Sequence, residues 1–184
     1  GRDAVAVYLG NPNVHHFSLM AYVPQLLRAI GTRNQFSASS VDQWPHQLVN
    51  WQMYGHQWLL PIPDLDRLDV LLMLGANPVA SNGSLMTAPD VTVRLKAIRD
   101  RGALIVVDPR RSETAEIASA HVPIRPGGDV WFLIALLQAL MRLGAPRLDA
   151  YAGKLHGFDA AMARVQAVQI DDLPQRIGIT MAQV

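Results

Sequence analysis

Residues 70–111 read VLLMLGANPVASNGSLMTAPDVTVRLKAIRDRGALIVVDPRR, and this stretch decides the fold. Two short apolar runs, VLLML and ALIVV, enclose a longer segment of mixed polarity. An almost wholly apolar run of this length is typical of a central strand in a parallel sheet, because both faces of such a strand are buried. The segment between the runs predicts a helix that connects two parallel strands. The stretch is therefore a strand–helix–strand unit.

The same alternation continues along most of the chain and predicts an α/β fold with three layers. The expected architecture is a mostly parallel, Rossmann-like sheet with helices on both faces. Residues 32–43, TRNQFSASSVDQ, are polar and predict a loop. The helix expected over 130–143 is apolar nearly all round, which predicts that it is buried, with Asp129 as its N-cap. Including the unit described above, strands are expected over 4–9, 65–74, 103–107 and 121–125, and the other helices over 17–30, 45–54 and 90–100.

This pattern divides the chain into two parts. Residues 1–145 are expected to form an α/β domain of the dinucleotide-binding kind. Beyond this point the pattern weakens to two short helical stretches and a tail, so we expect 146–184 to be a helical extension truncated at a domain boundary. The last residues, ITMAQV, resemble the opening of a helix without its second turn. We therefore expect the chain to be an excised piece of a larger protein.

Composition excludes several classes of protein. The chain has 184 residues, of which 50% are hydrophobic and 17% are charged, so it can bury a real core. Its net charge of +1 provides no field that would attract nucleic acid, and its longest apolar run, 130–137, is much shorter than the ~20 residues of a membrane-spanning helix. We therefore expect neither nucleic-acid binding nor membrane insertion. The absence of cysteine excludes disulfides and thiolate ligands from this segment and leaves the compartment open, with the cytoplasm favoured over the periplasm.

Four loops that follow predicted strands carry the residues with chemical potential. Ligands of parallel sheets bind outside the carboxyl ends of the strands, where glycines let the backbone approach a phosphate and arginines bind it in a bidentate manner. A carboxylate in such a loop can accept both N1–H and the exocyclic amine of guanine. The same residue types are also ordinary turn formers, and the residues alone leave both interpretations open. The four loops are 10–13, 75–78, 108–112 and 126–129.

Other known sites are disfavoured by their spacing. No Gly-x-Gly-x-x-Gly motif is present, so an ordinary NAD domain is not expected. None of the six histidines forms a His-x-x-x-His pair, which argues against a zinc site.

Four strings, in this order, resemble the molybdopterin oxidoreductases, the family of molybdenum or tungsten enzymes that includes formate dehydrogenases, nitrate reductases and dimethyl sulfoxide reductases. They are NQFSASSVDQWP (34–45), MLGANPVASN (73–82), VVDPRRSETAEIA (106–118) and PIRPGGD (123–129). The chain is similar to the first α/β half of the family's catalytic subunit. The resemblance implies that it contacts one of two molybdopterin guanine dinucleotides.

The resemblance also implies which residues bind this cofactor. The loop after the second predicted strand would line the dinucleotide, the next loop would contact the guanosine and its phosphates, and the last would contact the same nucleotide. Ser112 and Gly128 stand where the family often has threonine, and neither change removes a backbone donor. The implied cofactor-binding residues are Gly75, Asn77, Pro78, Asp108, Pro109, Arg110, Arg111, Gly127, Gly128 and Asp129.

The metal ligand implied by the resemblance falls on Asp42. A carboxylate oxygen suits a hard, high-valent molybdenum or tungsten centre. Gln43 is the alternative if the loop is shifted by one residue, although a neutral amide is a poor ligand. Asp42 could instead cap the helix that begins near Pro45. His46 is the candidate general base.

The function implied is two-electron oxidation or reduction at molybdenum or tungsten in the full-length parent, the isolated fragment being inactive. The parent would carry an iron–sulfur cluster outside this segment, act on a small redox substrate and pair with electron-transfer subunits. The alternatives are a non-catalytic nucleotide-binding domain and a scaffold domain that has lost the metal.

Overall fold

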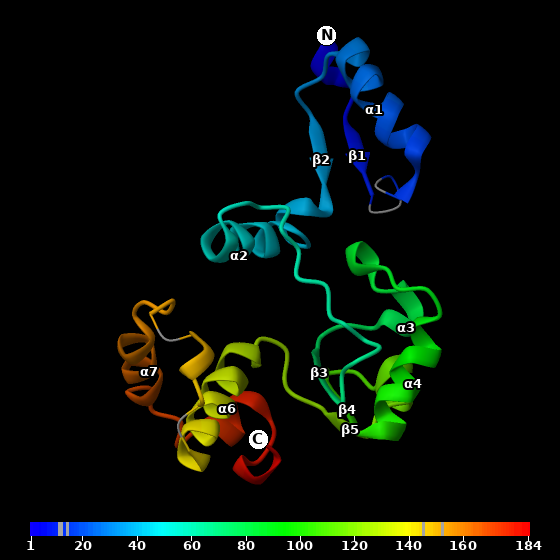
Figure 1. Ribbon diagram of the computed structural model, residues 1–184. Helices are drawn as coiled ribbons and strands as arrows, with labels where there is room; N and C mark the ends of the chain where they lie inside the picture. The colour runs from blue at the N-terminus through cyan, green and yellow to red at the C-terminus, as the bar shows by residue number, and fades with distance from the viewer. Residues whose placement is uncertain (11–12, 14, 145, 152) are drawn as a thin grey trace. The chain divides into compact units, whose positions relative to one another are not determined.

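The computed structural model describes residues 1–10, 13, 15–144, 146–151 and 153–184, and its chain divides into two compact units, Gly1–Ile62 and Pro63–Val184 (Figure 1). The sequence did not indicate a division at this point, and the boundary expected near residue 145 stays a prediction. The first unit contains β1 (Val7–Leu9), α1 (Phe17–Ile30), β2 (Gln35–Ser37), η3 (Ala38–Ser40) and α2 (Trp44–Tyr54), after a short turn of 3-10 helix, η1 (Arg2–Ala4).

The second unit contains the strand–helix–strand stretch and everything after it. Its first elements are β3 (Val70–Leu74), α3 (Pro78–Ser81), η4 (Ser84–Met86), α4 (Val91–Arg101), β4 (Ala103–Val107), α5 (Glu113–Glu116) and β5 (Ala120–Val122). They are followed by α6 (Asp129–Leu143), η5 (Asp149–Tyr151), α7 (Phe158–Gln166), α8 (Leu173–Ile177) and η6 (Met181–Gln183).

The sheet of the second unit is parallel, in the order β3-β4-β5. Leu74 is paired with Val107, and Val107 with Val122, so the three strands end at the same edge of the sheet. Strands β3 and β4 confirm the prediction that the two apolar runs form neighbouring parallel strands. The last strand is shorter than the expected 121–125, because Pro123 lacks the N–H that would continue the ladder.

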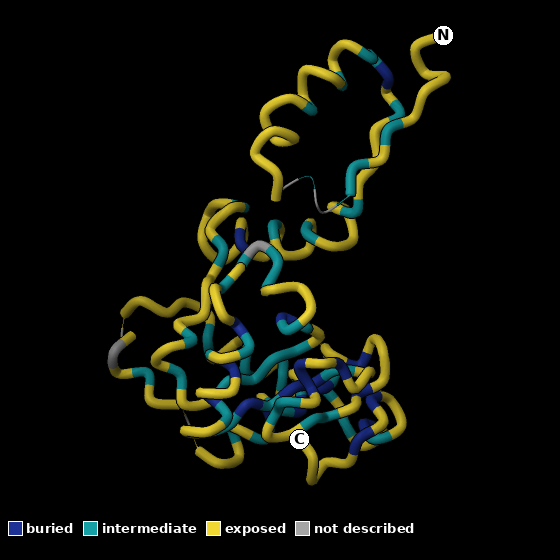
Figure 2. Tube along the Cα trace, turned by 90° about the vertical axis from the view of Figure 1, so that its right-hand side faces the viewer, coloured by how far each residue is buried: buried dark blue, intermediate teal, exposed yellow. Residues whose placement is uncertain are grey.

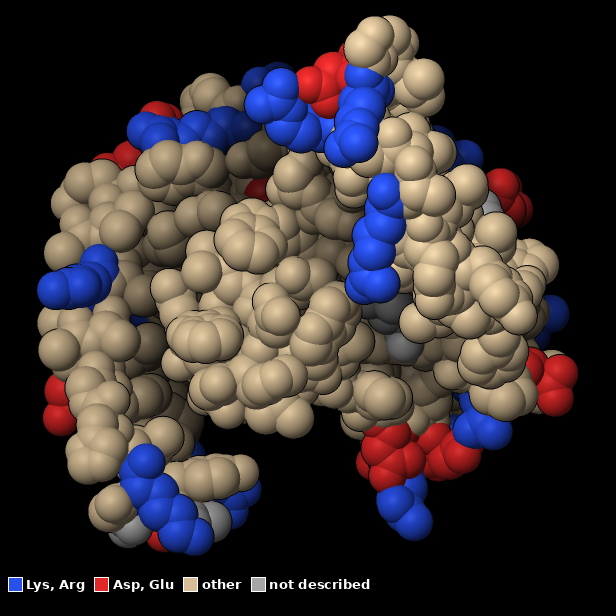
Figure 3. Space-filling view, turned by 90° about the horizontal axis from the view of Figure 1, so that it is seen from above, with Lys and Arg blue, Asp and Glu red and all other residues tan. Residues whose placement is uncertain are grey.

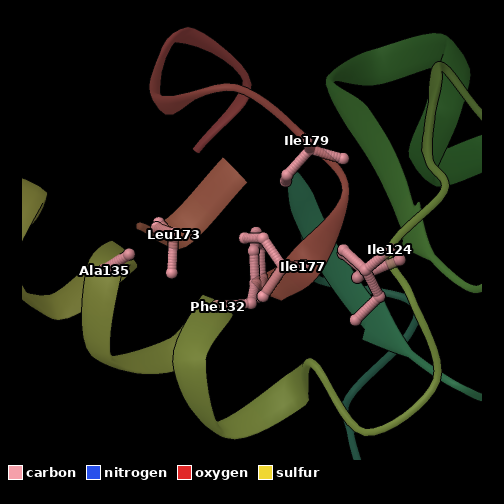
Figure 4. Packing of buried hydrophobic residues seen from close by; sticks show 7 residues of the cluster. Ile124, Phe132, Ala135, Leu173, Ile177 and Ile179 are labelled. Carbon is pink, nitrogen blue, oxygen red and sulfur yellow. The ribbon is translucent and has the colours of Figure 1, made fainter. Parts of the chain in front are cut away.

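Helices cover both faces of this sheet, which confirms the expected three-layer arrangement. Successive side chains of a strand point to opposite faces. Leu104 and Val106 of β4 accordingly pack with Leu95 and Ile98 of α4 on one face. Val107 belongs to a second cluster on the other face, where α6 and α8 contribute most of the side chains (Figure 4). The labelled members of this second cluster are Ile124, Phe132, Ala135, Leu173, Ile177 and Ile179.

Helix α6 differs from expectation in two respects. Only one of its faces is buried, through Phe132, Ala135 and Gln138, whereas Val130 is 65% exposed, so the prediction of a helix buried all round was wrong. The amide of Gln138 donates to the carbonyl oxygens of Val165 and Val168 and thereby ties α7 to α6. The N-cap is Gly128, with Asp129 as the first helical residue and no side-chain capping bond, so the predicted capping role of Asp129 was also wrong.

The first unit pairs β1 with β2 in parallel, and α1 connects them. Residues 32–43 were expected to be a loop, and the structure corrects this, because Gln35–Ser37 form β2. Its three residues are too few and too polar to show a strand pattern, and pairing with β1 holds them extended. Among the described residues of this unit only Thr32 and Asn50 are buried, whereas the second unit gathers most of the buried positions (Figure 2).

The surface agrees with the weak net charge. On the face seen in Figure 3, most residues are uncharged, and basic and acidic side chains stand singly or in small groups. Within the described parts of the chain, every helix is too short or too polar to span a bilayer.

Candidate cofactor-binding site

Three of the four loops singled out in the sequence follow the adjacent strands β3, β4 and β5. Backbone hydrogen bonds carry the ladder one residue beyond the strands. The N–H of Gly75 donates to the carbonyl oxygen of Val107 at 2.9 Å, and the N–H of Asp108 donates to that of Val122 at 3.1 Å. The loops after β3 and β4 therefore begin at one level along one edge of the sheet, whereas the loop 126–129 begins four residues after the end of β5. The fourth loop, 10–13, belongs to the first unit, and its Asn11 and Pro12 lie outside the described residues.

Asn77 joins the loop after β3 to the start of α5, which directly follows the loop after β4. Its Oδ1 accepts hydrogen bonds from the Oγ1 of Thr114 at 2.7 Å and from the N–H of Thr114 at 3.2 Å. Its Nδ2 donates to the Oε2 of Glu113 at 2.7 Å. The Thr114 hydroxyl also accepts from the N–H of Val79 at 3.2 Å. The side chain of Asn77 is therefore engaged within the protein.

The loop after β4 is held from within. The Oδ1 of Asp108 accepts from the N–H of Arg110 at 2.8 Å, which forms the turn that an aspartate before such a loop favours. Ser112 is buried and caps α5, since its Oγ accepts from the N–H of Ala115 at 3.3 Å. These two bonds fix the backbone on both sides of Arg111.

The charged groups of this loop lie at the surface. The guanidinium of Arg110 lies 3.3 Å from the Oε2 of Glu113. The pKa of the Glu113 carboxyl is held below its ordinary value, mainly by a hydrogen bond from its own backbone N–H and then by the amide of Asn77. Arg111 is exposed and forms no ion pair with any described residue. Two cations therefore follow Asp108 in this loop, and one of them, Arg110, is paired with Glu113.

The glycines of the site fall into two kinds. Gly75 and Gly127 have positive φ angles of 61° and 80°, and apart from their chain neighbours no residue comes within 4 Å of the place a Cβ would occupy. Gly128 is buried, and a Cβ there would lie 2.9 Å from the carbonyl oxygen of Arg125 and 3.1 Å from the side chain of Ile177. Gly75 and Gly127 thus leave open space beside the backbone, whereas Gly128 is required for packing.

Asp42 lies in the first unit, in a cavity of about 170 Å³ outside the carboxyl ends of β1 and β2. The cavity contains Gln43, the alternative ligand, and does not include His46, which is exposed. Asp42 does not cap α2, because the N-cap is Gln43 and no side chain makes a capping bond there. The lining consists of Leu9, Gly10, Asn13, Ser37, Ala38, Ser39, Asp42 and Gln43.

Within the described residues, no group of three or more His, Cys, Asp or Glu side chains is placed to hold a metal ion. A metal at Asp42 would therefore take most of its ligands from outside the described chain.

Sequence reasoning missed Glu113 and Thr114, although both lie in the string 106–118, and it missed His121. No sequence pattern marks His121, whose imidazole contacts the main-chain carbonyl of Asp108 only because β5 pairs with β4. No sequence pattern marks Thr114 either, because its partner Asn77 lies 37 residues away in the chain.

Curated proteins with known activities are similar to this chain. The molybdopterin-containing subunit of arsenate respiratory reductase from Chrysiogenes arsenatis is 27% identical over 77% of the chain and 17% of its own length. A nitrate reductase from Shewanella frigidimarina is 30% identical over 66% of the chain and 13% of its own length. An assimilatory nitrate reductase from Haloferax mediterranei is 26% identical over 87% of the chain and 22% of its own length.

Among solved structures, acetylene hydratase from Pelobacter acetylenicus superimposes with a TM-score of 0.66 at 21% identity, over 100% of this chain and 24% of that one. This likeness supports the fold. No protein-family profile matches the chain. The chain spans a quarter or less of each of these similar proteins.

Proposed function

The chain belongs to the molybdopterin oxidoreductases, and we propose that it forms part of a catalytic subunit in which the loops after β3, β4 and β5 bind part of a molybdopterin guanine dinucleotide. The observation that carries this proposal is that the three parallel strands preceding these loops end at the same edge of the sheet. Parallel sheets bind nucleotides at this edge.

The residues present fit the nucleotide half of such a cofactor. The open space beside Gly75 and Gly127 lets the ligand approach the backbone. The Oδ2 of Asp108 has no hydrogen-bond partner within the described residues, so the carboxylate can accept the N1–H and amine of guanine. Arg110 and Arg111 supply cations for the phosphates. The proposed set is completed by Pro78, Pro109, Gly128 and Asp129, and by Asn77 through its backbone.

Asp42 is proposed as the protein ligand of the metal, because its carboxylate lines a cavity and takes no part in capping α2. His46, the third residue of α2, is proposed to hold or move a proton near this cavity. The cofactor, when bound, supplies two-electron oxidation or reduction. The chain's own part is to bind and orient it.

Elemental and nucleotide analysis tests the proposal. The natural polypeptide that carries this chain is purified anaerobically from cells supplied with molybdate or tungstate. We expect molybdenum or tungsten in the preparation, and GMP released from it by acid. Asp108→Asn should lower the GMP content at least tenfold, because the amide presents a donor where guanine also presents one. Asp171→Asn, a matched change at an exposed carboxyl outside the three loops, should leave it unchanged.

Two other outcomes would contradict the proposal. Well-folded protein that contains neither metal nor guanine would favour the scaffold alternative. Protein that releases AMP instead of GMP, with equal amounts from Asp108→Asn, would favour a nucleotide-binding domain of another kind.

A second experiment separates Asp42 from Gln43. In Asp42→Cys, X-ray absorption at the metal edge should show one oxygen ligand replaced by sulfur, because thiolates bind these metals. Gln43→Cys lies in the same cavity and should leave the metal's ligands unchanged. The reverse result would place the ligand one residue later.

A further inference from the structure

Asn77 and Thr114 connect the two loops that carry most of the proposed nucleotide contacts. We infer that this pair is a positioning device, which fixes the Gly75 loop and the Arg110 loop at the separation that the guanine dinucleotide requires. The inference rests on the proposed function. It assigns Asn77 a role other than direct contact with the cofactor through its side-chain oxygen.

The first argument is the hydrogen-bonding capacity of the two side chains. A side-chain amide has two acceptor positions and two donor hydrogens. Both acceptor positions of Asn77 are filled by Thr114, and one donor hydrogen is given to Glu113. The Thr114 hydroxyl donates to Asn77 and accepts from the N–H of Val79. Little capacity remains for a ligand at either side chain.

The second argument is burial. Thr114 is 0% exposed, so water has no access to replace a lost hydroxyl. Without that hydroxyl, the N–H of Val79 loses its partner and the oxygen of Asn77 loses one of two donors. The bonds between the loops would then be reduced to the N–H of Thr114 and the carboxylate of Glu113.

The third argument is the path from the pair to the charged groups. Glu113 accepts from Asn77 at 2.7 Å through the same Oε2 that lies 3.3 Å from the Arg110 guanidinium. The orientation of Asn77 therefore affects the position of the Arg110 guanidinium, because both groups contact the same oxygen of Glu113. Arg110 is one of the cations proposed to contact phosphate. Thr114 sets that orientation, because it supplies both donors to the Asn77 oxygen.

The test uses three threonine variants in the natural polypeptide. Thr114→Val keeps the shape of the side chain and removes its hydroxyl, and Thr114→Ser restores the hydroxyl. Thr92→Val makes the same change on α4, where the threonine hydroxyl has no hydrogen bond to a described residue. Two quantities are measured: GMP per polypeptide after prolonged dialysis, and hydrogen exchange of the backbone amides of residues 75–77 and 79.

We expect Thr114→Val to retain at least fivefold less GMP and to exchange the Val79 amide at least tenfold faster. Thr114→Ser should recover most of both quantities, and Thr92→Val should change neither. The double variant Asn77→Ala with Thr114→Val should lose no more GMP than the worse single variant, because the two side chains act as one unit.

A purely structural role for the pair predicts a different pattern. Nucleotide content would then follow the stability of the fold, and Ile98→Ala, a core variant far along α4, would lose as much GMP as an equally destabilised Thr114→Val. We expect Ile98→Ala to keep its GMP under conditions where it is folded.

Two further outcomes distinguish a failure of this inference from a failure of the proposed function. Faster amide exchange in Thr114→Val with unchanged GMP would overturn the positioning role and leave the proposed function standing. The absence of guanine from the unaltered polypeptide would overturn the proposed function and this inference with it.

Discussion

The imidazole Nε2 of His121 lies 2.8 Å from the main-chain carbonyl oxygen of Asp108. This bond ties β5 to the first residue of the loop that follows β4, beside the backbone bond from Asp108 to Val122. The carbonyl and the N–H of Asp108 are thus both held by the neighbouring strand, and its Oδ1 is held by the N–H of Arg110, which leaves the Oδ2 without a hydrogen-bond partner among the described residues.

Replacing His121 by phenylalanine should destabilise the second unit by about 1 kcal/mol, because the half-buried carbonyl of Asp108 loses its partner. Urea unfolding followed by circular dichroism measures this change. His156→Phe makes the same substitution at an exposed position and should lie within about 0.5 kcal/mol of the unaltered chain. Equal effects of the two variants would show that the imidazole bond contributes nothing to stability.

Gly102 lies where α4 ends and β4 begins, and its lack of a side chain is required by the packing. A Cβ at this position would lie 1.9 Å from the carbonyl oxygen of Asp69, a backbone atom that cannot move without disturbing the start of β3. Gly102→Ala should therefore cost about 1–3 kcal/mol or more in unfolding free energy.

A matched glycine separates this clash from backbone strain. Gly157 has a φ of +76° and open space around it, so Gly157→Ala carries only the cost of a left-handed alanine, about 1–2 kcal/mol. Thermal unfolding compares the two variants. A smaller loss of stability in Gly102→Ala than in Gly157→Ala would contradict the clash.

Leu95 and Val93 lie two residues apart on α4 and test which face of the helix supports the sheet. Leu95 is 0% exposed in the cluster with Leu104, whereas Val93 is 67% exposed. Leu95→Ala should lower the unfolding free energy by about 2–5 kcal/mol, because it leaves a cavity in the core. Val93→Ala should change it by less than about 0.5 kcal/mol. Chemical denaturation of both variants measures the difference, and similar losses would contradict the packing of α4.

The elements that sequence predicts well are those whose local signals agree. The helix over 17–30 was predicted with both ends in place, since Gly31 provides a left-handed C-cap, and the strand over 103–107 was predicted because both of its faces are apolar and buried. Strand β2 had no such signal. Its residues are polar at the ends and its extended form depends on pairing with β1, a contact between residues distant in the chain.

The same distinction applies to the candidate site. Loops rich in glycine and arginine could be located from sequence, because turn residues and strand ends are local features. The Asn77–Thr114 pair could not, because it joins residues far apart in sequence through side-chain geometry. The exposed face of α6 could not be foreseen either, since an apolar residue carries no sign of whether a partner covers it.

The ionisation of Glu113 gives a pH-dependent prediction. Its folded-state pKa is lowered by hydrogen bonds from its own backbone N–H and from the amide of Asn77, with the charge of Arg110 contributing less. The unfolded chain, with a glutamate pKa of about 4.3, therefore binds this proton more readily than the folded chain does. The stability that Glu113 contributes is complete above that pH and is lost as the pH falls through the folded-state pKa.

Two variants separate these causes. We expect Asn77→Ala to raise the pKa of Glu113 toward its ordinary value, because the carboxylate loses a direct hydrogen bond. Arg110→Gln should raise it less, since an exposed cation at 3.3 Å is screened by water and salt. A carbon-detected NMR titration of the Glu113 carboxyl measures both shifts in the 184-residue chain. A larger rise in Arg110→Gln than in Asn77→Ala would show that charge, and not the asparagine bridge, holds this carboxylate ionised.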